Sequence, residues 1–244
     1  MKNFSNRYIY IYSIVLVIIV ATILAGVAVL LKPFQQKNIN AETMQMLLSS
    51  AGIQVERNAA EKNYAKYFTK EITVDAQGNI VDEYIDGKQT KGSEQPFKVN
   101  IKAQYKAYKS GAEAKLPVFI CVKDGDTTYV VPVRGAGLWG DIWGNIALKS
   151  DLNTVKGIVF DHESETPGLG SKIKDDPKFA QSFVGKTIFE GDEFKSVQVI
   201  KRIGTDNPHA VDAITGATLT SNGVSAMLND CLKFYLPYFK TLKK

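Results

Sequence analysis

Charged side chains are absent from one long stretch near the N-terminus. Tyr8 to Leu31 is a 24-residue run of apolar and uncharged residues between Arg7 and Lys32. As a helix that rises about 1.5 Å per residue, this run would reach about 36 Å, enough to cross a hydrocarbon core of about 30 Å. The pattern predicts one transmembrane helix over residues 8–31, which separates a short N-terminal segment, 1–7, from residues 32–244.

A cleaved signal peptide is the alternative interpretation of the same run. Its apolar core would measure about 7 to 15 residues and lead into a small-residue cleavage site. Here the run is longer and ends in Leu30-Leu31-Lys32-Pro33, so we expect a retained membrane anchor. Lys2, Arg7 and the terminal amine precede the span, against Lys32 and Lys37 after it. The positive-inside rule therefore favours, by a small margin, a cytoplasmic N-terminus and an extracytoplasmic main domain.

Residues 32–115 carry clear secondary-structure signals, and we assign them no chemistry. Helical spacing of apolar residues alternates with short β-rich runs and polar turns. We expect this region to pack on the segment that follows. Its predicted elements are helices over 40–50 and around 64–68, strands over 71–74 and 80–85, and an exposed loop over 88–95.

Residues 116–244 are β-rich and end in a helix. Short β-branched and aromatic runs flank turn residues, of which Lys123-Asp-Gly-Asp126 is a good hairpin signal. We therefore predict an α+β fold, with an antiparallel-rich sheet and flanking helices, preceded by one transmembrane helix. The predicted elements are strands over 116–122, 128–133, 155–160 and 194–200, a helix over 179–184, and a C-terminal helix capped by Ser221, whose apolar face is Val224, Met227, Leu228, Cys231 and Leu232.

Composition excludes several classes of protein. The formal charge is +5, but the lysines are scattered among acidic residues, so we predict no nucleic-acid binding. Cys121 and Cys231 are too far apart in sequence to form a metal or redox motif. His162, Glu163 and Glu165 lack a further convergent ligand, so we predict no metal site.

Three islands rich in glycine and hydroxyl residues follow in order. They are 135–140 (Gly-Ala-Gly-Leu-Trp-Gly), 161–170 (Asp-His-Glu-Ser-Glu-Thr-Pro-Gly-Leu-Gly) and 212–221 (Asp-Ala-Ile-Thr-Gly-Ala-Thr-Leu-Thr-Ser). The third leads into a helix N-terminus, where unpaired backbone N–H groups and the helix dipole favour an anion such as a phosphate. Local physics alone is equally compatible with a tight turn at the first island and an ordinary capped loop at the third.

The third island resembles the flavinylation motif Asp-x-x-Ser/Thr-Gly-Ala-Ser/Thr. In proteins with this motif, a separate flavin transferase joins FMN through its phosphate to the last hydroxyl residue, here Thr218. That hydroxyl must attack a phosphoanhydride, and the small Gly216 and Ala217 leave room for the enzyme. Thr215 stands where the motif more often has Ser, a small change because both residues carry a hydroxyl.

With the N-terminal span, the three islands resemble the C subunit of the sodium-translocating NADH:quinone reductase. The specific motifs lie within residues 134–224. The G subunit of the Rnf ferredoxin:NAD oxidoreductase shares the flavin domain. It usually has a shorter segment after the anchor and lacks the Leu-Trp-Gly form of the first island, so it is the second choice.

The resemblance implies an FMN-binding domain, residues 116–244, that carries electrons in a membrane complex of the bacterial inner membrane. Partners would be the other subunits of the reductase, the flavin transferase during maturation, and membrane lipid. Sodium movement would belong to the assembled enzyme. The implied site residues are Thr218 as the attachment point, Thr215, Gly216, Ala217 and Thr220 near the phosphate, Glu165, Thr166, Leu169 and Gly170 along the isoalloxazine, Leu138 and Trp139 at the border of the pocket, and Asp212 for transferase recognition.

Two other functions fit the sequence less well. An anchored non-redox module could use the glycine-rich loops to grip another phosphate ligand or a partner protein. An anchored hydrolase could use Ser221 or Thr220 with His162, but the chain has no nucleophile-elbow pattern.

Overall fold

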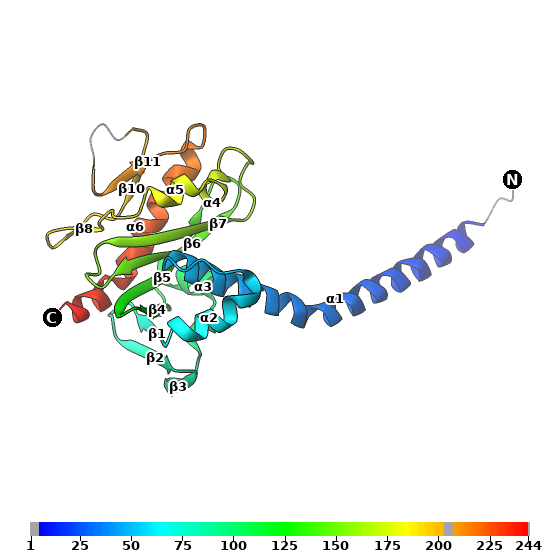
Figure 1. The fold of residues 1–244 in the computed structure, drawn as a ribbon. Coiled ribbons are helices and arrows are strands. Elements are labelled where there is room, and N and C mark those ends of the chain that lie inside the picture. Colours follow the sequence, from blue (N-terminus) through cyan, green and yellow to red (C-terminus); the bar gives the residue numbers. More distant parts are fainter. Residues whose placement is uncertain (1–4, 203–206, 244) are drawn as a thin grey trace. The chain divides into compact units, whose positions relative to one another are not determined.

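The computed structural model describes residues 5–202 and 207–243 (Figure 1). The chain divides into two compact units between Thr43 and Met44. The first unit is helical, and the second contains the sheet and the remaining helices. Lys2, which entered the orientation argument, lies outside the described residues.

Helix α1 runs without interruption from Asn6 to Ser50. Among the described residues it is the one helix that is long and apolar enough to cross a membrane. The separate helix predicted over 40–50 is wrong, because these residues form the last turns of α1. Pro33 lies inside the helix, where a proline removes one backbone hydrogen bond without necessarily ending the helix.

A seven-stranded antiparallel sheet forms the centre of the second unit, in the order β3-β2-β1-β4-β5-β6-β7. The predicted antiparallel-rich sheet is confirmed. Residues 32–115 and 116–244 both contribute strands to it. The strands are β1 Lys70–Asp75, β2 Ile80–Ile85, β3 Lys88–Lys91, β4 Lys115–Lys123, β5 Asp126–Ala136, β6 Asp141–Lys149 and β7 Val155–His162.

Helices cover both faces of this sheet (Figure 1). The last turns of α1 and helix α2 pack with Phe119, Cys121 and Val130 on one face, whereas α6 and α3 pack on the other. The remaining elements are η1 Arg57–Ala59, α2 Ala60–Tyr67, η2 Pro96–Lys98, α3 Ile101–Lys109, α4 Lys172–Asp175, α5 Pro177–Gln181, β8 Phe189–Glu190, β9 Glu193–Phe194, β10 Gln198–Ile200, β11 Ala210–Asp212 and α6 Thr218–Leu242.

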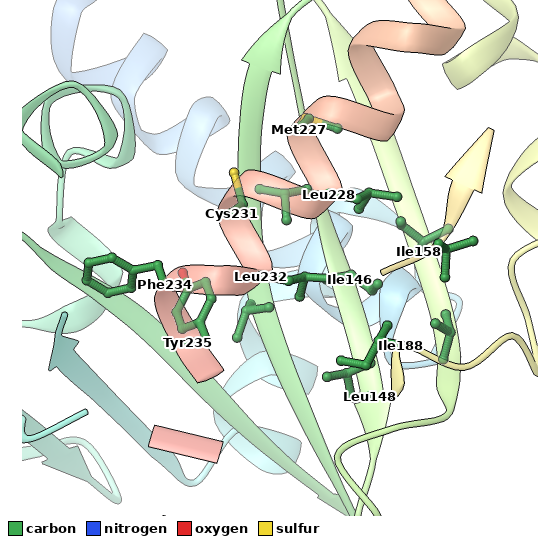
Figure 2. Packing of buried hydrophobic residues seen from close by; sticks show 14 of the residues in the cluster. Ile146, Leu148, Ile158, Ile188, Met227, Leu228, Cys231, Leu232, Phe234 and Tyr235 are labelled. Atoms are coloured by element: carbon green, nitrogen blue, oxygen red, sulfur yellow. The ribbon is translucent and has the colours of Figure 1, made fainter. Parts of the chain in front are cut away.

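Helix α6 supplies the centre of the larger core. Figure 2 shows Met227, Leu228 and Leu232 directed at the sheet, where Ile146 and Ile158 lie. The predicted apolar face of the helix is confirmed, because each of its five residues is buried. The helix can lie this close because Gly135 of β5 has no side chain: a Cβ there would come within 2.8 Å of the Met227 Cβ.

Three short segments differ from the sequence-based expectation. The helix predicted over 179–184 is α5, which lies over Pro177–Gln181, and residues 182–185 form a turn. The exposed loop predicted over 88–95 begins with strand β3, which pairs with β2 although its side chains are exposed. The single strand predicted over 194–200 is instead split between β9 and β10. Ser196 lies between them with a φ of 60°, which no residue of a continuous strand adopts.

Asp82 on β2 is hydrogen-bonded to β1, to β4 and to the loop that follows β3. Its buried carboxylate accepts hydrogen bonds from the Thr73 hydroxyl at 2.6 Å and the Lys115 ammonium at 2.7 Å. The backbone N–H groups of Ser93 and Glu94 donate to it as well. Burial by itself would raise the pKa of Asp82, but these hydrogen bonds outweigh burial and lower the pKa to about 2.

Truncation of the α6 core should destabilise the second unit strongly. Leu228 is fully buried, so Leu228→Ala should lower the free energy of unfolding by about 2 to 5 kcal/mol through lost burial and a residual cavity. Leu242→Ala is the matched control, since this leucine is 42% exposed on the same helix and should change stability by at most about 0.5 kcal/mol. Denaturant unfolding of the full chain in detergent measures both, and equal effects would contradict the assigned core.

Asp82 should make stability depend on pH in the acid range. The folded pKa, about 2, lies below the unfolded value of about 3.9, so the carboxylate stabilises the fold above about pH 4 and this contribution is lost as the pH falls toward 2. The stability difference between wild type and Asp82→Asn should therefore shrink over that window. Unfolding curves of both proteins between pH 5 and 2 test this, and a constant difference would refute it.

Candidate functional site

The three islands meet at one edge of the sheet. The first forms the turn between β5 and β6, closed by a hydrogen bond from Gly137 N to Gly140 O at 2.8 Å. The second leaves the end of β7, and the Ser164 hydroxyl donates to Trp139 O at 2.8 Å. The third leads from β11 into α6. Because neighbouring antiparallel strands start and end at the same edge, the sheet brings these segments together.

Glu165 connects all three islands. Its side chain is buried, and its Oε1 accepts hydrogen bonds from the backbone N–H groups of Leu138 at 2.7 Å and Trp139 at 3.0 Å. Its Oε2 accepts one from the Thr220 hydroxyl at 2.6 Å. The carboxylate thus joins the β5–β6 turn to the first turn of α6 across the loop that carries it.

Glycines make room for this carboxylate. A Cβ on Gly137 would collide with Glu165 Oε1, and a Cβ on Gly170 would collide with Oε2 and lie 2.7 Å from the Thr220 hydroxyl oxygen. A Cβ on Gly223 would strike the carbonyl oxygen of Ala136. At these three positions glycine is required because neighbouring groups lie too close for a side chain.

Helix α6 begins at Thr218, four residues earlier than predicted. Ser221 as its N-cap is wrong: Ala217 occupies the cap position and no side chain caps the helix. The buried Ser221 hydroxyl instead accepts from the backbone N–H of Ile214 at 3.2 Å, which holds the loop before the helix.

The start of α6 presents groups that suit an anion. Thr218 is exposed. In the described part of the chain, the backbone N–H groups of Thr218, Leu219 and Thr220 donate to no acceptor. Unpaired N–H groups and the positive end of the helix dipole favour negative charge there. Gly216 has a φ of +81°, which lets the chain turn sharply into this position.

Each of the three islands carries exposed apolar side chains. Trp139 is 65% exposed and Leu169 is 41% exposed. Leu169 lies over the motif itself, since a Cβ on Gly216 would be 2.9 Å from its Cδ2. Leu138, 45% exposed, adjoins Trp139, and Leu219, 60% exposed, adjoins Thr218. Sequence reasoning missed Leu219, although its place beside Thr218 in the motif could have indicated it.

The other predicted residues lie in the same loops. The carbonyl of Thr166 accepts from the N–H groups of Leu169 and Ser171, both at 3.1 Å, which shapes the turn that presents Leu169. Thr215 is exposed and Ala217 is buried. Asp212 and Thr215 line a cavity of about 390 Å³ together with Lys172 of α4 and Lys178 of α5, beside the motif.

An ionic cluster braces the β5–β6 hairpin next to the turn. The Arg134 guanidinium donates to Asp141 Oδ2 at 2.6 Å, and the Lys102 ammonium of α3 lies 2.8 Å from the same oxygen. Lys102 and Arg134 together lower the pKa of Asp141. Arg134 also lies over the Trp143 ring, 5.1 Å from its centroid. Sequence reasoning missed this cluster, which adds Lys102 of a distant helix to two residues of one hairpin.

The geometry does not support the hydrolase. Ser221 and Thr220 are both buried, and among the described residues neither hydroxyl is hydrogen-bonded to His162. The His162 Nδ1 instead accepts from the backbone N–H of Glu165 at 3.2 Å. The described residues also contain no group of three or more His, Cys, Asp or Glu side chains placed to hold a metal ion.

Comparison with known proteins identifies the domain. The family model of the FMN-binding domain matches residues 137–233, a stretch that contains most of the first island and all of the second and third. The fold and the site therefore define a protein with an FMN-binding domain.

The curated relatives narrow this to one family. The chain is 35% identical to the C subunit of the Na(+)-translocating NADH-quinone reductase of Haemophilus ducreyi, over 86% of this chain and 83% of that protein. It is 31% identical to the corresponding protein of Neisseria meningitidis serogroup B, which bears the same name, over 99% of this chain and 95% of that one. The chain belongs to the family of C subunits of the Na(+)-translocating NADH-quinone reductase.

A solved structure supports the same assignment. The crystal structure of the C subunit of the Na(+)-translocating NADH-quinone reductase from Parabacteroides distasonis matches with a TM-score of 0.74 and 34% identity. The match covers 88% of this chain and 98% of that one. The recognition of the family from its three islands is confirmed.

Gly170→Ala should disturb the contact between Glu165 and Thr220. The added Cβ would lie within 2.7 Å of the Thr220 hydroxyl oxygen, so we expect a loss of about 1 to 3 kcal/mol in unfolding free energy. Gly168→Ala is the comparison, since no atom lies within 4 Å of its Cβ position and only its φ of +76° is unfavourable. It should lose about 1 kcal/mol. Chemical denaturation of the protein without flavin measures both, and a neutral Gly170→Ala would contradict the packing described here.

Proposed function

We propose that this chain carries electrons in a membrane-bound, sodium-translocating NADH:quinone reductase through one FMN, joined by a phosphoester bond to Thr218. The observation that carries the proposal is the position of Thr218. Its exposed hydroxyl stands at the N-terminus of α6, inside a flavinylation motif and among exposed apolar side chains.

The residues present fit FMN at both of its ends. The phosphate would meet the unpaired N–H groups at the start of α6, where the helix dipole stabilises its negative charge. The isoalloxazine would lie against Leu169 and Trp139, whose exposed faces offer apolar surface for a flat ring. Bound FMN would supply the redox chemistry, and the protein would bind, orient and tune it.

Each predicted site residue has a role in this arrangement. Thr215, Gly216 and Ala217 would shape the turn that presents the Thr218 hydroxyl, and Thr166 and Gly170 would shape the loop under Leu169. Asp212 would serve recognition by the flavin transferase, which would join the Thr218 oxygen to the flavin phosphate as a phosphoanhydride breaks. Thr220 is buried and donates to Glu165, so it would hold the first turn of α6 in place without contacting the flavin.

The N-terminal helix supports a position of the carrier at a membrane. The apolar part of α1 would anchor the chain in the bacterial cytoplasmic membrane, with the FMN-binding segment, 116–244, on the extracytoplasmic side. The relatives are named as one subunit of a reductase, so the other subunits would give and take the electrons. The uncharged span from Tyr8 to Leu31 provides no ion path of its own.

The Rnf-type subunit and the non-redox module are the alternatives. Ferredoxin-linked activity in the complex that co-purifies with the chain would indicate the former. A colourless protein after co-expression with a flavin transferase would indicate the latter. Family membership, carried by relatives at 30% identity or more, favours the NADH:quinone reductase.

Peptide mapping tests the attachment residue. After co-expression with a flavin transferase, the tryptic fragment containing Thr218 should gain the mass of one FMN less one water. The flavin phosphoryl group replaces the hydrogen of the threonine hydroxyl, and the other half of the phosphoanhydride leaves as a nucleotide. Thr218→Ala should abolish covalent FMN, since no other hydroxyl occupies that position. Thr218→Ser should retain covalent FMN.

Thr241→Ala is the matched control. It removes a hydroxyl from an exposed residue near the far end of the same helix, outside the motif, and should leave FMN on Thr218. One covalent FMN on the Thr218→Ala protein, or an unmodified fragment from a yellow wild-type protein, would reject the assignment.

A further inference from the structure

We propose that Glu165 is a positioning residue that assembles the flavin surface before the cofactor is attached, and that its negative charge lowers the reduction potential of the bound flavin. The first part stands on the protein alone. The second rests on the proposed function.

The atoms that Glu165 contacts indicate that the flavin surface forms before the cofactor is attached. Its carboxylate binds the backbone of Leu138 and Trp139 and the side chain of Thr220, all within the protein itself. None of these bonds needs a flavin. They fix the backbone of the residue that carries the Trp139 ring, and they fix the helix turn that carries Thr218. The flavin would therefore meet a surface that is already formed.

The hydrogen-bond donors to Glu165 leave its negative charge without a neighbouring positive charge. Within the described part of the chain, the carboxylate contacts two backbone amides and one hydroxyl, all uncharged, and no cation. Its charge is buried, 4% exposed, directly behind the turn that carries Leu138 and Trp139. An uncompensated negative charge in a poorly solvated site acts over a longer range than one in water. It should disfavour the addition of electrons to a nearby flavin.

Glutamine separates the two effects. In Glu165→Gln the side-chain oxygen can still accept from both amides, and the NH₂ group can donate to the Thr220 oxygen. The shape and the number of hydrogen bonds stay the same while the charge is removed. Glu165→Ala removes the acceptors as well. Glu163→Gln and Glu163→Ala are the matched controls, two residues away on the same loop, at an exposed side chain that contacts one backbone amide, that of Asp141 at 3.3 Å.

The first experiment measures amide hydrogen exchange in the full chain without flavin, in a Thr218→Ala background. The amide protons of Leu138 and Trp139 should be protected, and Glu165→Ala should speed their exchange by roughly tenfold or more, as expected for the loss of hydrogen bonds to a charged group. Glu163→Ala should leave both rates unchanged. Unprotected amides in the parent protein would overturn pre-assembly.

A second variant covers the case in which Glu165→Ala does not fold. Thr220→Val removes one hydroxyl with little change of shape, and it should also speed exchange at Leu138 and Trp139 because the carboxylate loses the donor on its other oxygen. Thr220→Ser, which keeps the hydroxyl, should restore protection. Equal exchange in the Thr220→Val, Thr220→Ser and parent proteins would overturn the coupling between the helix and the turn.

The second experiment is a spectroelectrochemical titration of the flavin-loaded full chain. Glu165→Gln should shift the midpoint potential to a more positive value, with covalent loading and wild-type amide protection retained, whereas Glu163→Gln should leave the potential unchanged. An unchanged potential in loaded Glu165→Gln would overturn the charge effect. If no variant and no wild-type protein takes up FMN, the proposed function fails, and the exchange experiment still decides the positioning role.

Discussion

A single buried carboxylate joins segments that are far apart in sequence. Glu165 binds the backbone N–H groups of Leu138 and Trp139 and the hydroxyl of Thr220. Without this carboxylate, both backbone N–H groups in the turn would lose their acceptor within the protein. Gly137 and Gly170 are needed because any Cβ at either position would displace the carboxylate. One glycine in each of the first two islands, Gly137 and Gly170, is thus explained by what one glutamate requires.

The sheet makes that contact possible. The end of β5, the start of β6 and the end of β7 share one edge because the strands pair in antiparallel order. Helix α6 starts at the same edge and crosses the sheet, held close by the contact of Gly135 with Met227. At the far end of the helix, a Cβ on Gly78 in the β1–β2 turn would strike the backbone at Tyr238. The candidate site is therefore anchored by a helix whose other end contacts the β1–β2 turn.

The sequence predicts what periodicity and turn chemistry encode. The face of α6 from Val224 to Leu232 and the strands around Lys123 to Asp126 are read correctly, because burial repeats at a fixed spacing there. The start of α6 is misplaced: Ser221 is a good cap by residue type, yet its hydroxyl is used by Ile214, a contact that depends on the loop geometry. The contact of Lys102 with Asp141 and the exact partners of Glu165 are equally long-range, and single-sequence reasoning has no pattern from which to infer them.

The shallowness of the site gives a physical reason for a covalent bond. Trp139, Leu169 and Leu219 are each more than two-fifths exposed, so they form a surface and not an enclosed cavity. Such a surface buries only part of a flavin, whereas tight reversible ligands are buried over about 70 to 90% of their area. A phosphoester to Thr218 would replace the missing affinity with a high effective concentration, as any short tether does. Because the bond would be made through the phosphate, one edge of the isoalloxazine ring would stay open. An electron carrier between partner subunits requires such an open edge.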